Sequence, residues 1–178
     1  MPPVLRADVR LVPVAPEHAD DMYAWMCDPD VSRNVGLRSA PSPERTRAWI
    51  ARAVEDATIR AFAILEGPRH VGNVVLDQID EYLGTARLSL YVGKPAARGA
   101  GIGHTAVALA LREAFGALRL HKVWLTVHCR NTAAVRLYER LGFVVEGVLR
   151  GEFILDGERI DALRMSMLRG ELEEPGAG

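Results

Sequence analysis

The sequence is poor in the features that mark specialised classes of protein. Its 178 residues include only two cysteines, Cys27 and Cys129, which are too few for a disulfide scaffold and lack the paired spacing of a zinc ribbon. The longest apolar run, residues 106–111, is far too short to span a bilayer. We therefore expect free thiols that behave as small buried side chains in a reducing compartment.

The chain also lacks an excess of charge of one sign. Lysine and arginine number 22, and aspartate and glutamate number 23, which gives a net charge of −1. A general nucleic-acid binder needs a basic excess, so we expect no nucleic acid among the partners. Residues 1–10 carry prolines and charges instead of the apolar core of a signal peptide. The expectation is a cytoplasmic protein that binds no membrane.

What is present suits an ordinary globular domain. Apolar residues make up 49% of the chain and charged residues 25%, a composition that supports a core and argues against disorder. We expect one domain over residues 1–169, followed by an acidic, glycine-rich tail over residues 170–178.

Hydrophobic alternation and turn residues predict a series of strands. They lie near residues 9–12, 59–66, 71–80, 85–93, 122–127, 143–155 and 159–168. Helical periodicity and capping residues predict helices over residues 16–27, from residue 42 onward, over 102–118 and over 131–141, with an irregular loop at 31–42. This order predicts an α+β fold, with a mixed, mostly antiparallel twisted sheet and helices on both faces.

A glycine-rich segment, Arg98-Gly99-Ala100-Gly101-Ile102-Gly103, stands between a predicted strand and the longest predicted helix. Glycines let backbone N–H groups approach a ligand, and a helix start offers unpaired donors and the positive end of the helix dipole. Together they favour an anion site, most often for phosphate, to which Arg98 can add a bidentate contact. The alternative is that the glycines only turn the chain.

Two common nucleotide motifs do not fit this segment. The Rossmann fingerprint needs a third glycine where His104 stands, and an acidic residue where Lys122 and Val123 stand. The P-loop needs Gly-Lys followed by Ser or Thr, which the segment lacks. Both nucleotide interpretations therefore fail.

Two motifs together resemble a known superfamily, the GNAT N-acetyltransferases. The first is the Arg/Gln-x-x-Gly-x-Gly/Ala pattern, here Arg98-x-x-Gly101-x-Gly103. The second, in the same order, is Asn131-x-x-Ala134-x-x-x-Tyr138-x-x-x-Gly142-Phe143. The later hairpin resembles the branch that acetylates ribosomal proteins, polyamines and amino sugars, through Glu146-Gly147, Arg150 and Asp156-Gly157 followed by Asp161. The resemblance covers about residues 9 to 168.

This resemblance implies a three-layer α/β/α fold, acetyl-CoA as cosubstrate, and often a homodimer. The pyrophosphate site would be the loop and first helical turn, made of Arg98, Gly99, Ala100, Gly101, Ile102, Gly103 and His104. A bulge at residues 88–93 would splay that strand from the strand at 122–127. Acetyl-CoA would then pair with backbone groups of Leu90, Tyr91 and Val92, and an N–H near Val92 would stabilise the oxyanion.

Asn131, Ala134 and Tyr138 fall on one face of the predicted helix. Small Ala134 leaves room for a narrow chain, and Asn131 can bind the amides of pantetheine, cap the helix, or do both. Tyr138 is a weak acid that could protonate the departing thiolate, or it could be a half-buried tyrosine bonded to a neighbour. On the same helix, Arg136 or Arg140 could reach the 3′-phosphate of CoA or simply face solvent.

The sequence leaves the general base open. The position where many relatives carry glutamate reads Ala86-Arg87-Leu88, and Arg87 cannot act as a base. His128, just after a predicted strand, has a pKa range suited to proton transfer, but it could equally bond a loop carbonyl. Glu152 is another candidate, and a water chain leading to bulk solvent is a third.

The expected function is direct transfer of an acetyl group to the primary amine of a small molecule: a polyamine, an amino sugar or an amino acid. Residues 31–42 and 150–161 would form the acceptor wall. The alternatives are acetylation of a protein N-terminus, an acetyl-CoA sensor without turnover, and, disfavoured by the balanced charge, a toxin that acetylates aminoacyl-tRNA. No metal is expected, because the histidines show no ligand spacing.

Overall fold

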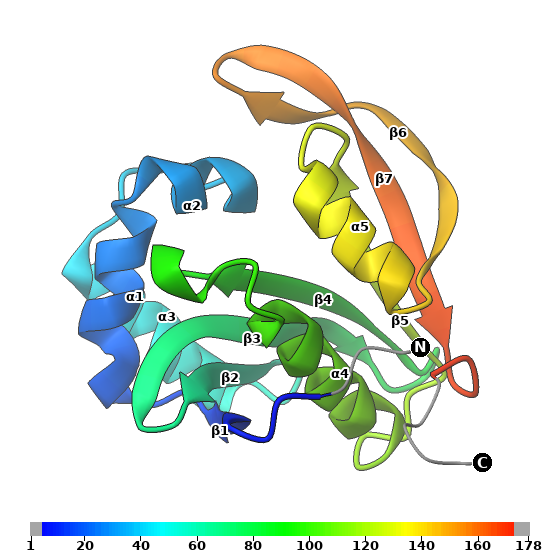
Figure 1. The fold of residues 1–178 in the computed structure, drawn as a ribbon, viewed down its shortest axis with the longest axis horizontal. Helices are drawn as coiled ribbons and strands as arrows, with labels where there is room; N and C mark the ends of the chain where they lie inside the picture. Colours follow the sequence, from blue (N-terminus) through cyan, green and yellow to red (C-terminus); the bar gives the residue numbers. More distant parts are fainter. Residues whose placement is uncertain (1–4, 173–178) are drawn as a thin grey trace.

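The structure, a computed structural model that describes residues 5–172, is built on one seven-stranded sheet (Figure 1). The strand order is β1-β2-β3-β4-β5-β7-β6, and every neighbouring pair is antiparallel except β4 with β5. The strands are β1 (Val9–Pro13), β2 (Arg60–Glu66), β3 (Arg69–Asp80), β4 (Thr85–Val92), β5 (Lys122–His128), β6 (Val144–Leu155) and β7 (Glu158–Leu168). The predicted mixed, mostly antiparallel sheet is confirmed.

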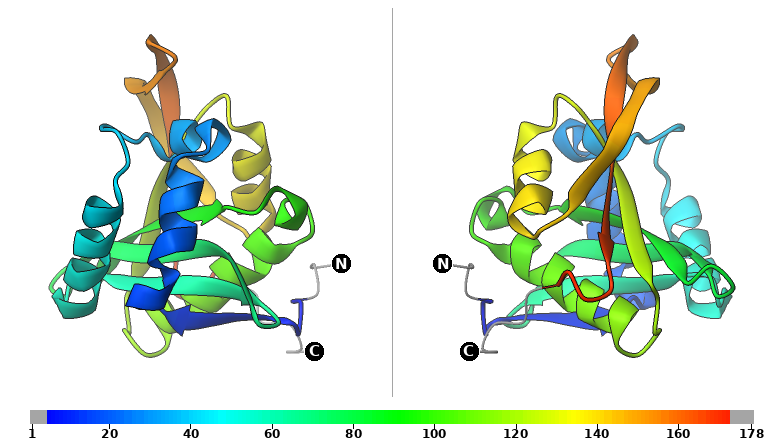
Figure 2. Two further views of the ribbon diagram at one scale, coloured as in Figure 1. Left: turned by 90° about the vertical axis from the view of Figure 1, so that its left-hand side faces the viewer. Right: turned by 90° about the vertical axis from the view of Figure 1, so that its right-hand side faces the viewer.

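Helices cover both faces of this sheet, in the predicted three layers (Figure 2). They are α1 (Ala19–Met26), α2 (Pro29–Val35), α3 (Pro43–Glu55), α4 (Ile102–Phe115) and α5 (Thr132–Arg140), with short 3₁₀ turns η1 (Pro16–His18) and η2 (Pro95–Ala97). One face packs on α4, whose fully buried Ile102, Val107 and Leu111 meet the inward side chains of β3, β4 and β5. The other face packs on α1 and α3, around Ile50. The predicted α4 extended to residue 118, but it ends at Phe115, before Gly116.

Helix α2 lies where an irregular loop was expected, so that expectation was wrong. Asp28 caps it by accepting a hydrogen bond from the Asp30 N–H at 2.9 Å, and Pro29 occupies the first helical position. Gly36 then ends the helix with φ +66°, in the left-handed region that favours glycine. The Asp-Pro pair that favoured a turn is therefore a helix start.

Strands β4 and β5 separate after a short parallel contact. They pair only at Thr85–Lys122, Ala86–Val123 and Arg87–Trp124. Beyond this point β4 follows β3, whereas β5 stays paired with β7 along its whole length. The expected splay is thus present, but the expected bulge at residues 88–93 is not: the β3–β4 register runs unbroken from Gly72–Val92 to Asp77–Arg87, and its shift falls between Asp77 and Asp80. The splay arises because each strand follows a different outer neighbour.

The β6–β7 hairpin turns at Asp156-Gly157, as predicted, with both residues at positive φ. Strand β6 forms an edge of the sheet and carries large apolar side chains that are 44–57% exposed: Val144, Val145, Val148 and Ile154. Two register shifts against β7, at Val145/Gly147 and Leu149/Phe153, bend the hairpin.

Both cysteines are exposed, which corrects the expectation of buried thiols. Cys27 is the C-cap residue of α1, and Cys129 follows the end of β5, so neither side chain lies in the sheet core. Of the predicted tail, residues 173–178 lie outside the described range. Within residues 5–172, no helix is both long and apolar enough to cross a membrane.

Candidate active site

The glycine loop presents a row of unpaired backbone donors at the start of α4. Gly99 and Gly101 have φ of +74° and +79°, and Gly101 is the N-cap residue, which has no side chain to offer. The first amide of this stretch to be paired is that of Thr105, which donates to the Gly101 carbonyl. Within residues 5–172, the N–H groups of residues 99–104 have no hydrogen-bond acceptor. Such a stretch of free donors at the positive end of a helix dipole is an anion site.

Arg98 lies beside this loop, but its side chain is already engaged. Its Nε donates to the Val92 carbonyl and one Nη to the Gly93 carbonyl, both at 3.1 Å. The guanidinium also pairs with Asp28 at 3.3 Å and Asp30 at 3.7 Å. Arg98 therefore ties the end of β4 to α2, and a phosphate contact would require it to exchange some of these partners.

Helices α4 and α5 and strand β4 converge around Gly103, and we call this place the passage. A methyl group added to Gly103 would lie 3.4 Å from both Leu137 of α5 and Leu90 of β4, and 4.0 Å from Val92. Leu90, Val92 and Gly103, which the sequence placed at one site, are therefore brought together. Beyond Arg87, the edge of β4 that faces β5 has no strand paired to it, so its backbone groups face the opening.

Tyr91 lies on the same strand, but its side chain points to the opposite face. Its hydroxyl donates to Asn73 Oδ1 at 3.0 Å, and its ring meets Trp25 edge-on. Its backbone groups face β3, because hydrogen bonds alternate along an antiparallel pair and Gly93, two residues later, donates to Val71 of β3. The expected backbone contact of Tyr91 with acetyl-CoA is therefore not available in this arrangement, whereas the backbone of Leu90 and Val92 faces the opening. The neighbouring Arg87 forms a two-pronged ion pair with Asp77, at 2.8 and 2.6 Å, which gives it a structural role in place of the family's glutamate.

Helix α5 places Tyr138 and Asn131 as the motif predicted. The Asn131 side-chain oxygen accepts the Ala134 N–H at 3.1 Å, so the residue does cap the helix, and its side-chain NH₂ has no partner within residues 5–172. Tyr138 is only 6% exposed and packs edge-on against Phe143. Its hydroxyl makes no hydrogen bond in the described part of the chain, yet the oxygen is not fully enclosed. Burial raises the pKa of the phenol, so Tyr138 stays protonated at neutral pH and suits the role of general acid.

His128 is 3% exposed at the end of β5, and its tautomer follows from its neighbours. Asn34 of α2 donates its side-chain NH₂ to the Asp30 carbonyl at 2.7 Å, which turns its Oδ1 toward His128 Nε2 at 3.0 Å. Because Asn34 Oδ1 is an acceptor, Nε2 carries the proton and Nδ1 holds a bare lone pair. Nδ1 is enclosed and unpartnered, and burial, with the charge of Arg130, lowers the pKa of the imidazole. His128 thus has the protonation state of a base, although its free nitrogen is covered.

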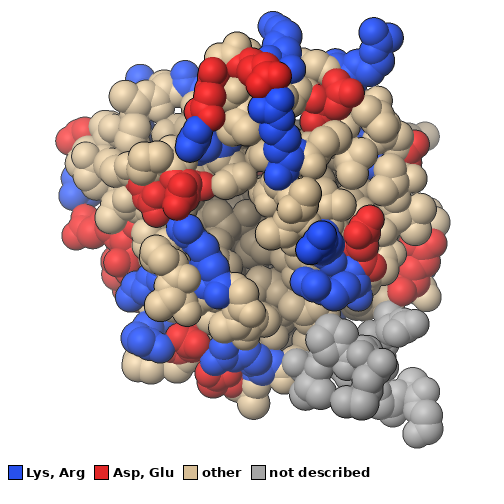
Figure 3. All heavy atoms as spheres, turned by 45° about the horizontal axis from the view of Figure 1, so that its top comes forward, with Lys and Arg blue, Asp and Glu red and all other residues tan. Residues whose placement is uncertain are grey.

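The two segments that were expected to form an acceptor wall do touch, through α2 and the β6–β7 hairpin. Arg33 makes a two-pronged ion pair with Asp156, and Asn34 bonds His128. Gly36 lies so close to the Phe153 ring that an added methyl group would be 3.0 Å from it. Figure 3 shows this face hollowed at its centre, with acidic and basic side chains around the hollow.

Most carboxylates near this wall are engaged. Asp28 and Asp30 pair with Arg98, Asp156 with Arg33, and Asp161 accepts the Gly151 N–H. Glu152 is exposed on β6 and has no partner within residues 5–172. Of these carboxylates, Glu152 is therefore the one that can bind a cation without first giving up a partner.

Two further hollows do not coincide with this site. One, of about 270 Å³, lies near Gly84 and Leu120, at the far end of β4. The other, of about 210 Å³, lies between α5 and β7 beside Cys129. The part of the chain that the structure describes contains no cluster of three or more potential metal ligands.

Comparison with known proteins identifies the family of the chain. The family model described as "Acetyltransferase (GNAT) domain" matches residues 8–144. The chain belongs to the GNAT acetyltransferase family. It is an acyltransferase that uses acetyl-CoA as cosubstrate.

Relatives and solved structures narrow the comparison within this family. The chain is 34% identical to a spermidine N(1)-acetyltransferase of Vibrio cholerae over 119 residues, which are 66% of this chain and 68% of the relative. It superposes on the crystal structure of spermidine N-acetyltransferase from Vibrio cholerae in complex with CoA and spermine with a TM-score of 0.88, at 25% identity, covering 93% of this chain and 98% of that one. A dodecameric structure of the same enzyme gives a TM-score of 0.81 at 25% identity, covering 93% and 96%.

Several residues of the GNAT site were not expected from the sequence. Asn34 and Arg33 stood in a predicted loop, and no local pattern connects them to His128 or Asp156, more than 90 residues away. Arg6, described below, likewise has no motif around it.

Proposed function

We propose that this GNAT protein transfers the acetyl group of acetyl-CoA directly to the primary amine of a small molecule, with Tyr138 as general acid. The observation that carries the proposal is the pairing of a donor-rich loop with a buried, protonated tyrosine whose hydroxyl has no internal partner. A protein that only senses acetyl-CoA needs the first feature but not the second.

The chemistry follows from these positions. The amides of residues 99–104 hold the pyrophosphate, and the free NH₂ of Asn131 and the open edge of β4 bind pantetheine. The unprotonated amine attacks the thioester carbon, and an N–H near Val92 stabilises the oxyanion. The C–S bond then breaks as the C–N bond is retained, and Tyr138 protonates the departing thiolate. The nitrogen, positively charged after the attack, releases its extra proton to water, and water returns a proton to the Tyr138 phenolate. No step needs an acyl-enzyme.

The acceptor amine must lose its extra proton before it attacks, and we propose that His128 Nδ1 removes it. The support is the bare lone pair imposed by Asn34. Because Nδ1 is enclosed, the acceptor or a water must displace a neighbour to reach it. Glu152 and a water chain are the competing routes. Replacing His128 by Gln and Glu152 by Gln separates them, since only the true base variant loses the acidic limb of the pH–rate profile.

Among small amines, we propose a polyamine as the first class to test. The support is the substrate named for the relatives, together with the unpaired carboxylate of Glu152 at the acceptor wall. Amino sugars and amino acids follow as candidates. Arginines neutralise most of the other acidic side chains, so a long polycation would have to compete with Arg98 and Arg33 for them.

The test is thiol release from acetyl-CoA with spermidine, spermine, aminoglycosides, amino-sugar nucleotides, amino acids and N-terminal peptides. Turnover with a polyamine supports the proposal. Turnover with peptides alone would transfer the assignment to protein N-terminal acetylation, and tight acetyl-CoA binding without turnover would favour a sensor. Absence of acetyl-CoA binding would refute the role of the glycine loop.

We also propose a cytoplasmic homodimer whose subunits act through one domain over residues 1–169. The support for a dimer is the apolar surface of the edge strand β6, where a second copy can cover Val144, Val148 and Ile154. The support for the cytoplasm is the pair of exposed, unbridged cysteines, which suits a reducing compartment.

A further inference from the structure

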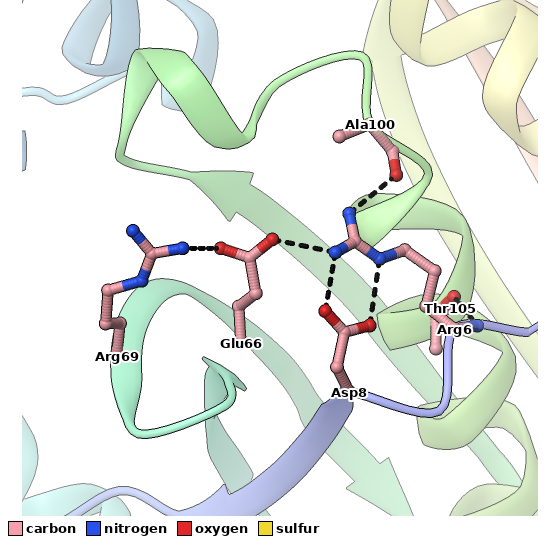
Figure 4. A network of polar contacts seen from close by, with 6 residues as sticks. All are labelled: Arg6, Asp8, Glu66, Arg69, Ala100 and Thr105. Carbon is pink, nitrogen blue, oxygen red and sulfur yellow. Dashed lines mark hydrogen bonds and ion pairs between the residues drawn. The ribbon is translucent and has the colours of Figure 1, made fainter.

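A polar network joins the N-terminal segment to the glycine loop across three distant stretches of the chain (Figure 4). The Arg6 guanidinium donates twice to Asp8, from Nε at 3.0 Å and from Nη2 at 2.6 Å. Nη2 also reaches Glu66 at 2.8 Å, and Arg69 holds the other oxygen of Glu66 at 2.6 Å. These contacts fix the Arg6 fork in one orientation, since a planar guanidinium held by two carboxylates cannot rotate freely.

The fork then reaches the loop itself. Arg6 Nη1 donates to the carbonyl oxygen of Ala100 at 3.0 Å. The backbone N–H of Arg6 donates to Thr105 Oγ1 at 3.1 Å, and the Thr105 side chain is buried in the first turn of α4. Arg6 therefore binds the chain on both sides of the unpaired amides of residues 101–104, at Ala100 before them and at Thr105 after them.

The contact with Ala100 decides where the next amide points. All peptide bonds in the described residues are trans, so the C=O of Ala100 and the N–H of Gly101 point in opposite directions across one plane. Holding the carbonyl toward Arg6 turns the Gly101 N–H away from Arg6. Gly101 at φ +79° has the freedom to rotate this peptide, so without Arg6 its orientation would not be fixed.

The network acts through geometry and adds no net charge. It contains two arginines and two carboxylates, and Asp8 raises the pKa of Arg6, which stays charged throughout. An arginine that bound the phosphate directly would keep its charge and donors free for CoA. Arg6 instead donates four of its five N–H groups to protein oxygens.

We propose that Arg6 is a positioning residue for the pyrophosphate site: it holds the Ala100–Gly101 peptide so that the loop amides are aligned before acetyl-CoA binds. The ligand in this inference rests on the proposed function, whereas the ordering of the loop by Arg6 does not. Preorganisation of this kind lowers the cost of binding without touching the reacting atoms.

The first experiment compares Arg6→Ala with Arg10→Ala, a matched control that removes an exposed arginine of β1 whose side chain makes no hydrogen bond or ion pair within residues 5–172. We expect Arg6→Ala to weaken CoA binding, measured by calorimetry, and to raise the KM for acetyl-CoA, each by about tenfold. That factor corresponds to the loss of one charge-assisted hydrogen bond. The kcat should change less than about twofold. Arg6→Lys, with a single ammonium nitrogen in place of the planar fork, should fall between. Equal weakening by Arg6→Ala and Arg10→Ala, or a fall in kcat at unchanged KM, would overturn the proposal.

The second experiment needs no ligand and separates this inference from the proposed function. Amide ¹⁵N relaxation of the free protein should show Gly99, Gly101 and Gly103 nearly as rigid as α4 in the unsubstituted protein and in Arg10→Ala. In Arg6→Ala their order parameters should fall below about 0.6, while those of α4 beyond its first turn are kept. An unchanged loop in Arg6→Ala would refute the positioning role even if acetyl-CoA binds. A loosened loop in a protein that binds no CoA would support it while the proposed function fails.

Discussion

Replacing Tyr138 by Phe tests the chemistry most directly, because the change removes one oxygen and keeps the ring. Tyr138 is only 6% exposed and its ring packs edge-on against Phe143, a packing that phenylalanine retains. The hydroxyl has no hydrogen-bond partner in residues 5–172, so no internal bond is lost. We therefore expect the free energy of unfolding to change by less than about 1 kcal/mol.

The effect on catalysis should be far larger. A positioned general acid contributes about 10²- to 10⁴-fold, and we expect kcat to fall by about 10²-fold or more. That fall corresponds to at least about 2.7 kcal/mol of transition-state stabilisation. Binding of CoA should change less than about twofold, because the pyrophosphate contacts lie on the glycine loop.

The assay is steady-state thiol release, with calorimetric CoA binding and thermal unfolding measured on the same samples. Tyr82→Phe, a tyrosine in the exposed turn before β4, is the control for loss of a hydroxyl. Burial raises the pKa of Tyr138 above its ordinary value near 10, so the unsubstituted enzyme should not lose its acid below that pH. A Tyr138→Phe enzyme that keeps more than half of its kcat would refute the reasoning.

Three other predictions concern the base, the passage and the edge strand. Burial lowers the pKa of His128, so its neutral, active form persists to below pH 6.5 and the acidic limb of the kcat profile should lie below that pH. In His128→Gln this limb should disappear and kcat should fall at least about tenfold. If His128→Gln kept the acidic limb, the limb would report the titration of another group. Gly103→Val should push a side chain against Leu90 and Leu137 and raise the KM for acetyl-CoA about tenfold or more. The control is Gly147→Val, where the added side chain enters open space. Equal effects of the two variants on KM would show that the passage is not part of the site. Val148→Asp should convert a dimer into a monomer in light scattering, and an unchanged mass would exclude β6 as the interface.

Local chemistry explains which elements the sequence predicted well. Ser42 and Asn131 cap their helices by side-chain bonds to amides three residues away, at 3.2 and 3.1 Å, so a short stretch suffices to recognise them. The Asp156-Gly157 turn is equally local. Helix α2 was missed because Asp28-Pro29 is compatible with both a turn and a helix start. The contacts between Asn34 and His128 come from a distant part of the chain, and they help to hold the helical alternative.

The sequence by itself determined the donor-rich loop, because free amides follow from glycines placed at a helix start and need no distant partner. It also determined the position of Tyr138 on the α5 face, since helical spacing sets it. Tertiary structure alone decided the state of the side chains around them. The raised pKa of Tyr138 comes from burial, the lone pair of His128 from Asn34, and the orientation of the loop from Arg6. Each depends on the dielectric or the hydrogen-bond partner that the fold brings from elsewhere in the chain, which no local pattern encodes.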